Sequence, residues 1–146
     1  MEELQQVKDK IRDFVKECND EKSLILLEKL ANGKMLRSKL ILKIAGVSNE
    51  SIDLCAVVEM IHAASLLHDD VIDESDTRRG QPSVNALFDN KTAIMFGDIL
   101  YSKAFTRLTF MPSKIAYTIS NAVTLLSLGE MMDVDLTESF NSSYDK

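Results

Sequence analysis

Apolar side chains recur every three or four residues at the start of the chain, which places them on one face of an α-helix. Within residues 2–18 these positions are Leu4, Val7, Ile11, Phe14 and Val15. The other face is charged, so the pattern predicts an amphipathic helix that packs on a core. A second helix is predicted over 24–30, where Asn19 or Asp20 can cap the start and Gly33 can end it.

Two more apolar segments follow. A third helix is predicted over 35–46 and ends at Gly46. A fourth runs apolar over 52–72, with Ser48 or Asn49 as its cap. Because apolar residues occupy nearly all of its sides, we expect this fourth helix to be buried.

Loop-forming residues fill 73–81, and Pro82 stands where a proline can open a helix at its first position. The segments 92–108 and 113–136 complete the predicted helices. Helix breakers are scarce, with 5 glycines and 2 prolines among 146 residues that are 45% hydrophobic. We therefore predict an all-α fold in which residues 1–146 form one helical domain.

The charge pattern narrows the expected partners. The net charge is −6 and lysine and arginine form no run, so a nucleic-acid-binding surface is not expected. The first residues are charged and no apolar stretch stands out as a bilayer span, so we expect neither a leader nor a transmembrane segment. Cys18 and Cys55 lack metal-binding spacing, which favours reduced thiols in a cytoplasmic protein.

The predicted fourth helix ends in a cluster of acids. Five of the eight residues 69–76 are acidic: Asp69, Asp70, Asp73, Glu74 and Asp76. Runs of charge are usually solvated surface, but carboxylates at a helix C-terminus meet the negative end of the helix dipole and repel one another. A bound cation would offset this repulsion, and the three aspartates lie close enough along the helix to converge on one.

Carboxylate oxygens favour Mg²⁺, which takes one or two carboxylates together with water and substrate phosphates. Arg78 and Arg79 follow the acids at once, and guanidinium groups bind phosphate oxygens bidentately. The alternative is simple ion pairing within the loop. A calcium-binding loop that starts at Asp73 is excluded, because Arg78 stands where glycine is needed and Val84 where glutamate is needed.

Three motifs at linked spacing make the chain resemble the trans-polyprenyl diphosphate synthases, and in particular their long-chain, octaprenyl type. The motifs are GKMLR at 33–37, similar to the family's GKxxR, DDVID at 69–73, and DTRRGQPSVN at 76–85. The resemblance covers most of this chain but only the N-terminal half of the family's sequence. It implies an isoprenoid-synthase-type helical bundle.

The resemblance assigns the acidic cluster to one substrate. Asp69, Asp70 and Asp73 match the first aspartate-rich motif, which binds the Mg²⁺ ions that hold an allylic diphosphate. Arg78 would bind the same diphosphate. These four residues are the catalytic candidates, because the implied reaction begins when the allylic diphosphate ionises.

By the same resemblance, Lys34, Arg37 and Arg79 would bind the diphosphate of isopentenyl diphosphate, and His62 would help them. A lone histidine on an apolar helix is more often a hydrogen-bonded core residue. His62 nevertheless lies two turns before the acids on the same helical stripe, which favours a place in the site. His68 has no such support and stays unassigned.

The implied reaction joins the isopentenyl double bond to the allylic cation and then loses a proton, which yields a precursor of quinone side chains. The growing tail should run beside the fourth helix, where Ala64 and Ser65 are small and the resembled short-chain enzymes carry aromatic rings. We therefore predict a heptaprenyl to decaprenyl product. Farther from Asp69 along the same helix come Ile61, Val58 and Val57, and none of them is bulky enough to be an obvious stop. Residues on another helix could stop the tail instead: Phe96, Phe105 and Met95, although each is more simply a core residue.

Two features at the end of the chain qualify these expectations. GEMMDV at 129–134 resembles a later family segment that contains Glu130, but a glutamine commonly stands at the position of Asp133. Asp133 could reach the metal side through water or be exposed on its helix, and we favour the exposed position. The family's second aspartate-rich motif would lie beyond Lys146, so the resemblance implies a truncated chain that is weak or inactive alone. Apolar surface left by truncation would favour a homodimer or a larger self-assembly.

Three alternatives compete with a synthase. A noncatalytic helical subunit of a heteromeric prenyl synthase commonly loses the acidic motif, which is intact here. A terpene cyclase fragment would not need Lys34, Arg37 or the stretch RRGQP, since a cyclase has no second diphosphate to bind. A plain helical interaction module would have no use for adjoining acids and arginines.

Overall fold

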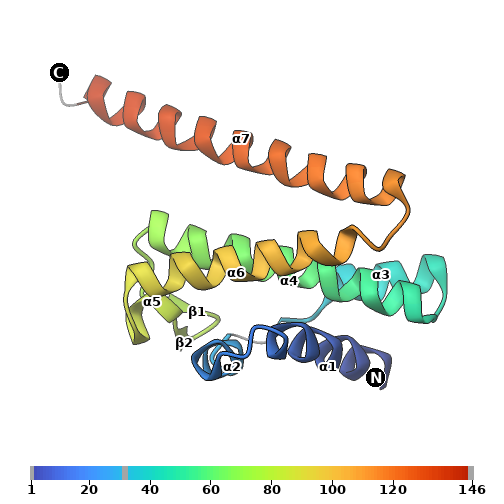
Figure 1. Ribbon diagram of the computed structural model, residues 1–146. Coiled ribbons are helices and arrows are strands. Elements are labelled where there is room, and N and C mark those ends of the chain that lie inside the picture. The colour runs from blue at the N-terminus through green and yellow to red at the C-terminus, as the bar shows by residue number, and fades with distance from the viewer. Residues whose placement is uncertain (1, 31–32, 145–146) are drawn as a thin grey trace. The chain divides into compact units, whose positions relative to one another are not determined.

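The computed structural model describes residues 2–30 and 33–144, and the chain groups into two compact units, Met1–Arg107 and Leu108–Lys146. That the units form one domain stays a prediction. Along the chain the elements are α1 (Glu2–Lys16), α2 (Glu21–Glu28), α3 (Leu36–Ala45), α4 (Asn49–Ile72), β1 (Thr77–Arg78), β2 (Gln81–Pro82), α5 (Val84–Leu87), α6 (Asn90–Leu108) and α7 (Ser113–Tyr144) (Figure 1). The all-α prediction is confirmed.

The first two helices follow the predicted pattern. Val7, Phe14 and Val15 are buried on the apolar face of α1. Asp20 caps α2, and its carboxylate accepts hydrogen bonds from the Ser23 backbone N–H at 3.0 Å and from the Ser23 hydroxyl at 2.7 Å. α2 ends at Glu28 rather than at Gly33.

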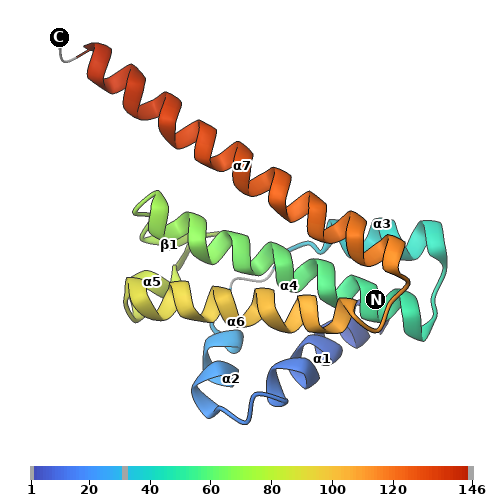
Figure 2. The same cartoon turned by 45° about the horizontal axis from the view of Figure 1, so that its top comes forward.

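α4 is the central helix of the first unit and contacts both α1 and α3 (Figure 2). Ser48 and Ser51 form a reciprocal cap at its start: the Ser51 backbone N–H donates to Ser48 Oγ at 3.1 Å, and the Ser48 N–H donates to Ser51 Oγ at 2.8 Å. Its buried apolar residues include Ile52, Cys55, Ala56, Val57, Met60, Ala64 and Leu67. α4 therefore carries much of the core.

By length and composition alone, α4 is long and apolar enough to cross a membrane, a property that no segment was expected to have. Residues buried inside the structure make up 44% of its most apolar window. A helix that is apolar on nearly all sides is also typical of a protein core, and α4 packs against α1 and α3.

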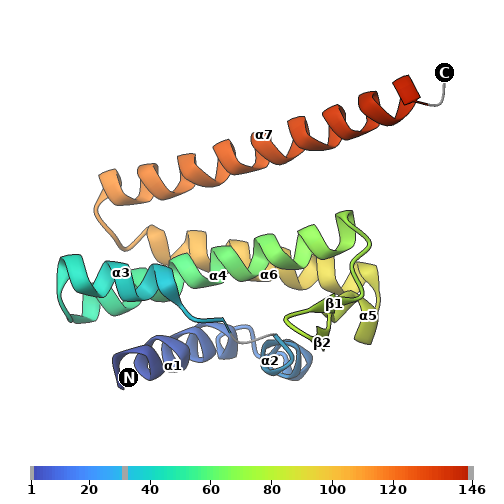
Figure 3. The same ribbon diagram turned by 180° about the vertical axis from the view of Figure 1, so that it is seen from behind.

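A short hairpin follows α4 where the sequence predicted a loop. Arg78 pairs with Gln81 and Thr77 with Pro82 in an antiparallel register, and Figure 3 shows this hairpin beside α5. Arg79 and Gly80 have φ angles of 52° and 75°, the positive values that a two-residue hairpin turn requires. Pro82 therefore ends a strand and opens no helix.

The last two helices are longer than predicted. α6 begins at Asn90 rather than Thr92, and α7 continues to Tyr144 rather than stopping at Leu136. α7 forms most of the second unit. Glu130 and Asp133 are exposed on it.

Candidate functional site

The last turn of α4 and the hairpin are joined by an ion pair. Arg78 Nη2 lies 2.6 Å from Asp70 Oδ1, and Arg78 Nε donates to Asp70 Oδ2 at 2.9 Å. Asp70 is only 4% exposed. The hydrogen bonds that Arg78 donates to Asp70 raise the pKa of Arg78, and the ion pair fixes Arg78 against the end of α4.

The three predicted metal-binding aspartates have different surroundings. Asp70 is buried against Arg78, whereas Asp69 is half-buried and Asp73 is exposed at the C-cap of α4. Among the described residues, no group of three or more histidine, cysteine or acidic side chains is placed to hold a metal ion. Asp69 and Asp73, one helical turn apart, still offer the hard oxygen donors that suit Mg²⁺ completed by water and phosphate oxygens.

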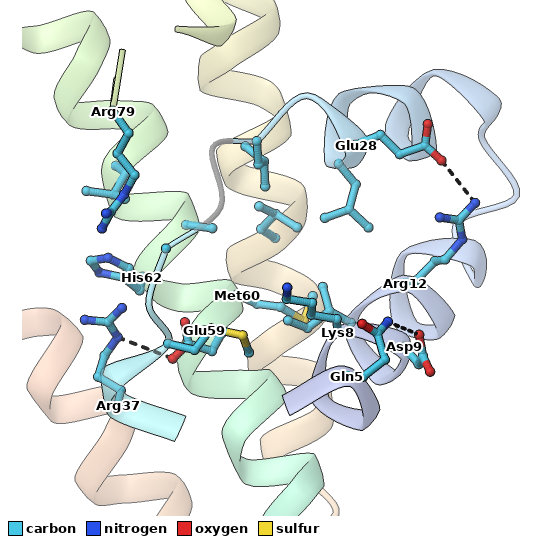
Figure 4. Close-up of a pocket in the computed structure, with 18 residues that line it drawn as sticks. Gln5, Lys8, Asp9, Arg12, Glu28, Arg37, Glu59, Met60, His62 and Arg79 are labelled. Atoms are coloured by element: carbon cyan, nitrogen blue, oxygen red, sulfur yellow. Dashed lines mark hydrogen bonds and ion pairs between the residues drawn. The ribbon is translucent and has the colours of Figure 1, made fainter. Parts of the chain in front are cut away.

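A cavity of about 340 Å³ brings together three of the residues predicted to bind isopentenyl diphosphate (Figure 4). Arg37 comes from α3, His62 from α4 and Arg79 from the hairpin turn, and all three line the cavity. Lys34 is exposed and does not line it. These three residues, up to 42 positions apart in the sequence, therefore meet in one pocket, whose lining also contains Lys8, Arg12, Asp9, Glu28 and Glu59.

The surroundings of His62, a neighbour of these arginines, favour its neutral form. Burial lowers the pKa of His62, and the positive charges of Arg37, Arg78 and Arg79 lower that pKa further, against an opposing effect of Glu59. A neutral imidazole can donate one hydrogen bond and accept another. The pocket thus combines fixed positive charge with a polar, neutral side chain.

Gly33 explains how Arg79 reaches the pocket. A Cβ atom built at Gly33 would lie 3.3 Å from Arg79 Nη2 and 3.7 Å from Arg79 Cζ. The guanidinium therefore sits over the backbone at the start of the GKMLR motif, and a larger residue there would crowd it. The glycine acts on the pocket rather than on the end of α2.

Sequence reasoning missed Glu59, which lines the same cavity. Its Oε1 lies 3.5 Å from Arg37 Nε and accepts a hydrogen bond from Ser38 Oγ at 3.0 Å. The available signal was its position one helical turn before His62, which places both residues on neighbouring parts of one helix face.

The two predicted chain-length residues differ in exposure. Ala64 is fully buried, and Ser65 is half-buried, with its hydroxyl donating to the His62 carbonyl at 2.7 Å. Of the residues considered as a possible stop, Phe96 is 1% exposed and Met95 is 65% exposed. Phe105 is half-buried and stacks on Tyr101, with ring centroids 6.0 Å apart.

His68, which the sequence left unassigned, connects α4 to α6. Its Nε2 lies 3.0 Å from the Ile94 carbonyl oxygen and 3.3 Å from Asp98 Oδ1. A Cβ atom built at Gly97 would lie 2.5 Å from the same nitrogen. Gly97 therefore permits the close approach of the His68 ring to α6, directly beside Asp69.

Comparison with known proteins agrees with these motifs. The family model described as polyprenyl synthetase matches residues 23–146. Octaprenyl diphosphate synthase from Escherichia coli is 41% identical over 97 residues, which are 62% of this chain and 30% of that protein. Synthases named for shorter products also match, so similarity does not fix the length of a product.

Solved structures of polyprenyl synthases share the fold of this chain. Octaprenyl pyrophosphate synthase from Helicobacter pylori superposes with a TM-score of 0.87 at 45% identity, over 91% of this chain and 46% of that one. A polyprenyl synthase from Caulobacter crescentus, solved with calcium and isoprenyl diphosphate, matches with a TM-score of 0.75 at 28% identity, over 88% of this chain and 41% of that one. This chain thus spans less than half the length of these relatives, and it belongs to the polyprenyl synthetase family.

Proposed function

We propose that these residues form the part of a long-chain trans-polyprenyl diphosphate synthase that binds the diphosphates of both substrates. The observation that carries the proposal is the separation of two neighbouring arginines. Arg78 pairs with Asp70 at the end of α4, whereas Arg79 lines the cavity with Arg37 and His62. One hairpin turn therefore supplies positive charge to two adjacent sites, as the condensation of two diphosphates requires.

The allylic diphosphate would lie at the end of α4. Asp69 and Asp73 would hold Mg²⁺ there, and Asp70 would act through Arg78 by fixing its guanidinium beside them. The solved relative with calcium and isoprenyl diphosphate supports a divalent metal, and the small hard oxygen donors favour Mg²⁺. Bound Mg²⁺ supplies positive charge that stabilises pyrophosphate as it leaves.

Isopentenyl diphosphate would bind in the basic cavity. Arg37 and Arg79 carry permanent charge for its diphosphate, and neutral His62 can donate a hydrogen bond to an oxygen of that group. Lys34 is exposed on the loop before α3; we keep it as a binding residue that would have to turn toward the ligand.

In the proposed reaction, the allylic C–O bond breaks and its electron pair leaves with pyrophosphate. The isopentenyl double bond then forms the new C–C bond with the allylic carbon, and a proton leaves the resulting cation to the departed pyrophosphate. Arg78 stabilises the negative charge that develops on the leaving group. The apolar residues that line the cavity, among them Met60, Ala63 and Leu66, help keep water from the cation.

The proposed long product follows from the small side chains of Ala64 and Ser65, which come five and four residues before Asp69 on α4. We propose that the tail passes Ser65 on the half-buried side of α4, with the stacked Tyr101 and Phe105 rings of α6 as a side wall. Ala64 is fully buried, so a tail can reach it only by entering between the helices.

Self-association as a homodimer or larger assembly is part of the proposal. Large apolar side chains are exposed on both units, including Leu36, Leu40 and Ile44 on α3 and Leu125, Leu126 and Met132 on α7. Such surfaces usually mark contacts with other protein. Sedimentation of the purified chain should show a species heavier than a monomer, and a monomer at micromolar concentration would contradict this part.

Calorimetry with a non-hydrolysable allylic thiolodiphosphate tests the function. We expect binding to the wild-type chain in Mg²⁺ and weak or no binding after chelation. Binding that is equal with and without Mg²⁺, or absent in both, would contradict the proposed allylic site.

A further inference from the structure

A largely buried acid, Glu59, lines the pocket that is proposed to bind an anion. The Glu59 side chain is only 11% exposed and lines the same cavity as Arg37, His62 and Arg79. A carboxylate at this position repels a diphosphate, so by charge alone an acidic residue would be unfavourable here. Its contacts suggest what compensates for this repulsion.

The contact between Glu59 and Arg37 involves only one edge of the guanidinium. Glu59 Oε1 lies 3.5 Å from Arg37 Nε, and Arg37 Nε is buried without a hydrogen-bond partner. Figure 4 shows the Arg37 guanidinium beside the His62 ring, with Nε toward Glu59. The terminal nitrogens of Arg37 are therefore turned toward the part of the cavity that contains His62.

We propose that Glu59 is a positioning residue for isopentenyl diphosphate and acts through Arg37. The carboxylate holds the Nε edge of the guanidinium, so that the terminal nitrogens stay aimed at the diphosphate without a further loss of side-chain freedom on binding. Ser38 Oγ, at 3.0 Å from the same Oε1, keeps the carboxylate in place. This inference rests on the proposed function, because it needs a diphosphate in the cavity.

The proposal and simple charge repulsion predict opposite changes in diphosphate affinity when Glu59 loses its charge. Glu59→Gln removes a negative charge from an anion site, which by charge alone would tighten binding. If Glu59 acts by positioning Arg37, the same change weakens binding. Charge repulsion and positioning can be separated by removing Arg37. Without the Arg37 guanidinium, Glu59 has nothing to position, and only its charge can affect binding.

The measurement is the Kd of inorganic pyrophosphate, determined by calorimetry without divalent metal, for the wild type, Glu59→Gln, Arg37→Ala and the double variant. We expect Glu59→Gln to raise Kd about 3- to 10-fold in the wild-type background. In the Arg37→Ala background the same change should leave Kd within about 2-fold or lower it. Equal weakening in both backgrounds would mean a general structural effect and would overturn the proposal.

Two controls keep the experiment decisive. Ser38→Ala removes a hydrogen bond of Glu59 but keeps the ion pair, and should change Kd less than Glu59→Gln does. If Glu59→Gln does not fold, Glu59→Asp keeps the charge at a shorter reach and should weaken binding by a smaller factor that again depends on Arg37.

The outcomes also separate this inference from the function on which it rests. If the wild type binds pyrophosphate and Glu59→Gln binds it equally well or more tightly, only the positioning role is overturned. No pyrophosphate binding by the folded wild-type chain overturns both the positioning role and the proposed basic pocket.

Discussion

Arg78 and Arg79 are neighbours in the sequence but serve different places in the structure. Both φ angles in the turn after Arg78 are positive, so the chain reverses there and the two side chains separate. A non-glycine residue with positive φ is uncommon and is often found at functional sites. At Arg79 this conformation places a guanidinium over Gly33 and into the cavity.

Asp70 and Asp73 should differ in their effects on folding. Asp70→Asn removes the charge that pairs with half-buried Arg78, and we expect it to lower the free energy of unfolding by about 1–3 kcal/mol. Asp73→Asn removes an exposed negative charge from a helix C-terminus and should change stability by less than about 0.5 kcal/mol. Urea denaturation measures both, and equal losses would contradict a special role for the Asp70–Arg78 pair.

His62 should make stability depend on pH. Its pKa in the folded chain is lowered from the ordinary value of 6.5, so the unfolded chain binds its proton more readily. Stability is therefore full above about pH 6.5 and falls as the pH drops from there through the lowered folded-state pKa. Thermal unfolding between pH 5 and pH 7.5 measures this, and His62→Gln should show a flatter profile; identical profiles would remove His62 as the cause.

Among the elements, α4 and α6 meet beside the acids, where His68 of α4 lies against Gly97 of α6. Gly97→Ala would place a Cβ atom 2.5 Å from His68 Nε2, and the His68 ring is held by the Ile94 carbonyl. We expect a loss of about 1–3 kcal/mol in the free energy of unfolding. His68→Ala should relieve most of this loss in the double variant.

Gly129→Ala on α7 is the matched control, because a Cβ atom there meets nothing within 4 Å. Removing a glycine from a helix interior should stabilise α7 by about 0.5–1 kcal/mol. Circular dichroism should therefore show more helix for Gly129→Ala and earlier unfolding for Gly97→Ala. Equal responses of the two variants would show that the α4–α6 contact is not unusually tight.

The sequence predicted the helices because their signals are local. The apolar spacing of α1, the Ser48 cap of α4 and Gly46 at the end of α3 act within a few residues. The hairpin was missed because two-residue strands are too short to show alternation. Pro82 was misassigned because a proline can equally open a helix or end an edge strand.

The candidate site was predictable only in part, for the same physical reason. The motifs identified Arg37 and Arg79, and the family resemblance added His62; the cavity brings all three together. The Asp70–Arg78 and Glu59–Arg37 pairs depend on how the hairpin and α3 pack on α4, and sequence spacing does not determine that packing. The burial of Ala64 beside half-buried Ser65 likewise appears only once α4 is packed.

For the whole molecule, the length of the product tests the proposed path of the tail. Ser65→Phe would place a ring on the half-buried side of α4 below Asp69. Because this chain is expected to be only weakly active alone, radiolabelled products are collected at high protein concentration, and they should become shorter than those of the wild type. Met95→Ala, at a side chain that is 65% exposed, should leave the product length unchanged. Unaltered products in Ser65→Phe would mean that the tail takes another route.

The central claim is that one hairpin serves two diphosphate sites, and calorimetry on two variants tests it most directly. Asp73→Asn should abolish Mg²⁺-dependent binding of an allylic thiolodiphosphate but keep metal-free binding of pyrophosphate. Arg79→Ala should do the reverse. If either variant loses both kinds of binding while remaining folded, or loses neither, the two sites are not separate and the account is wrong.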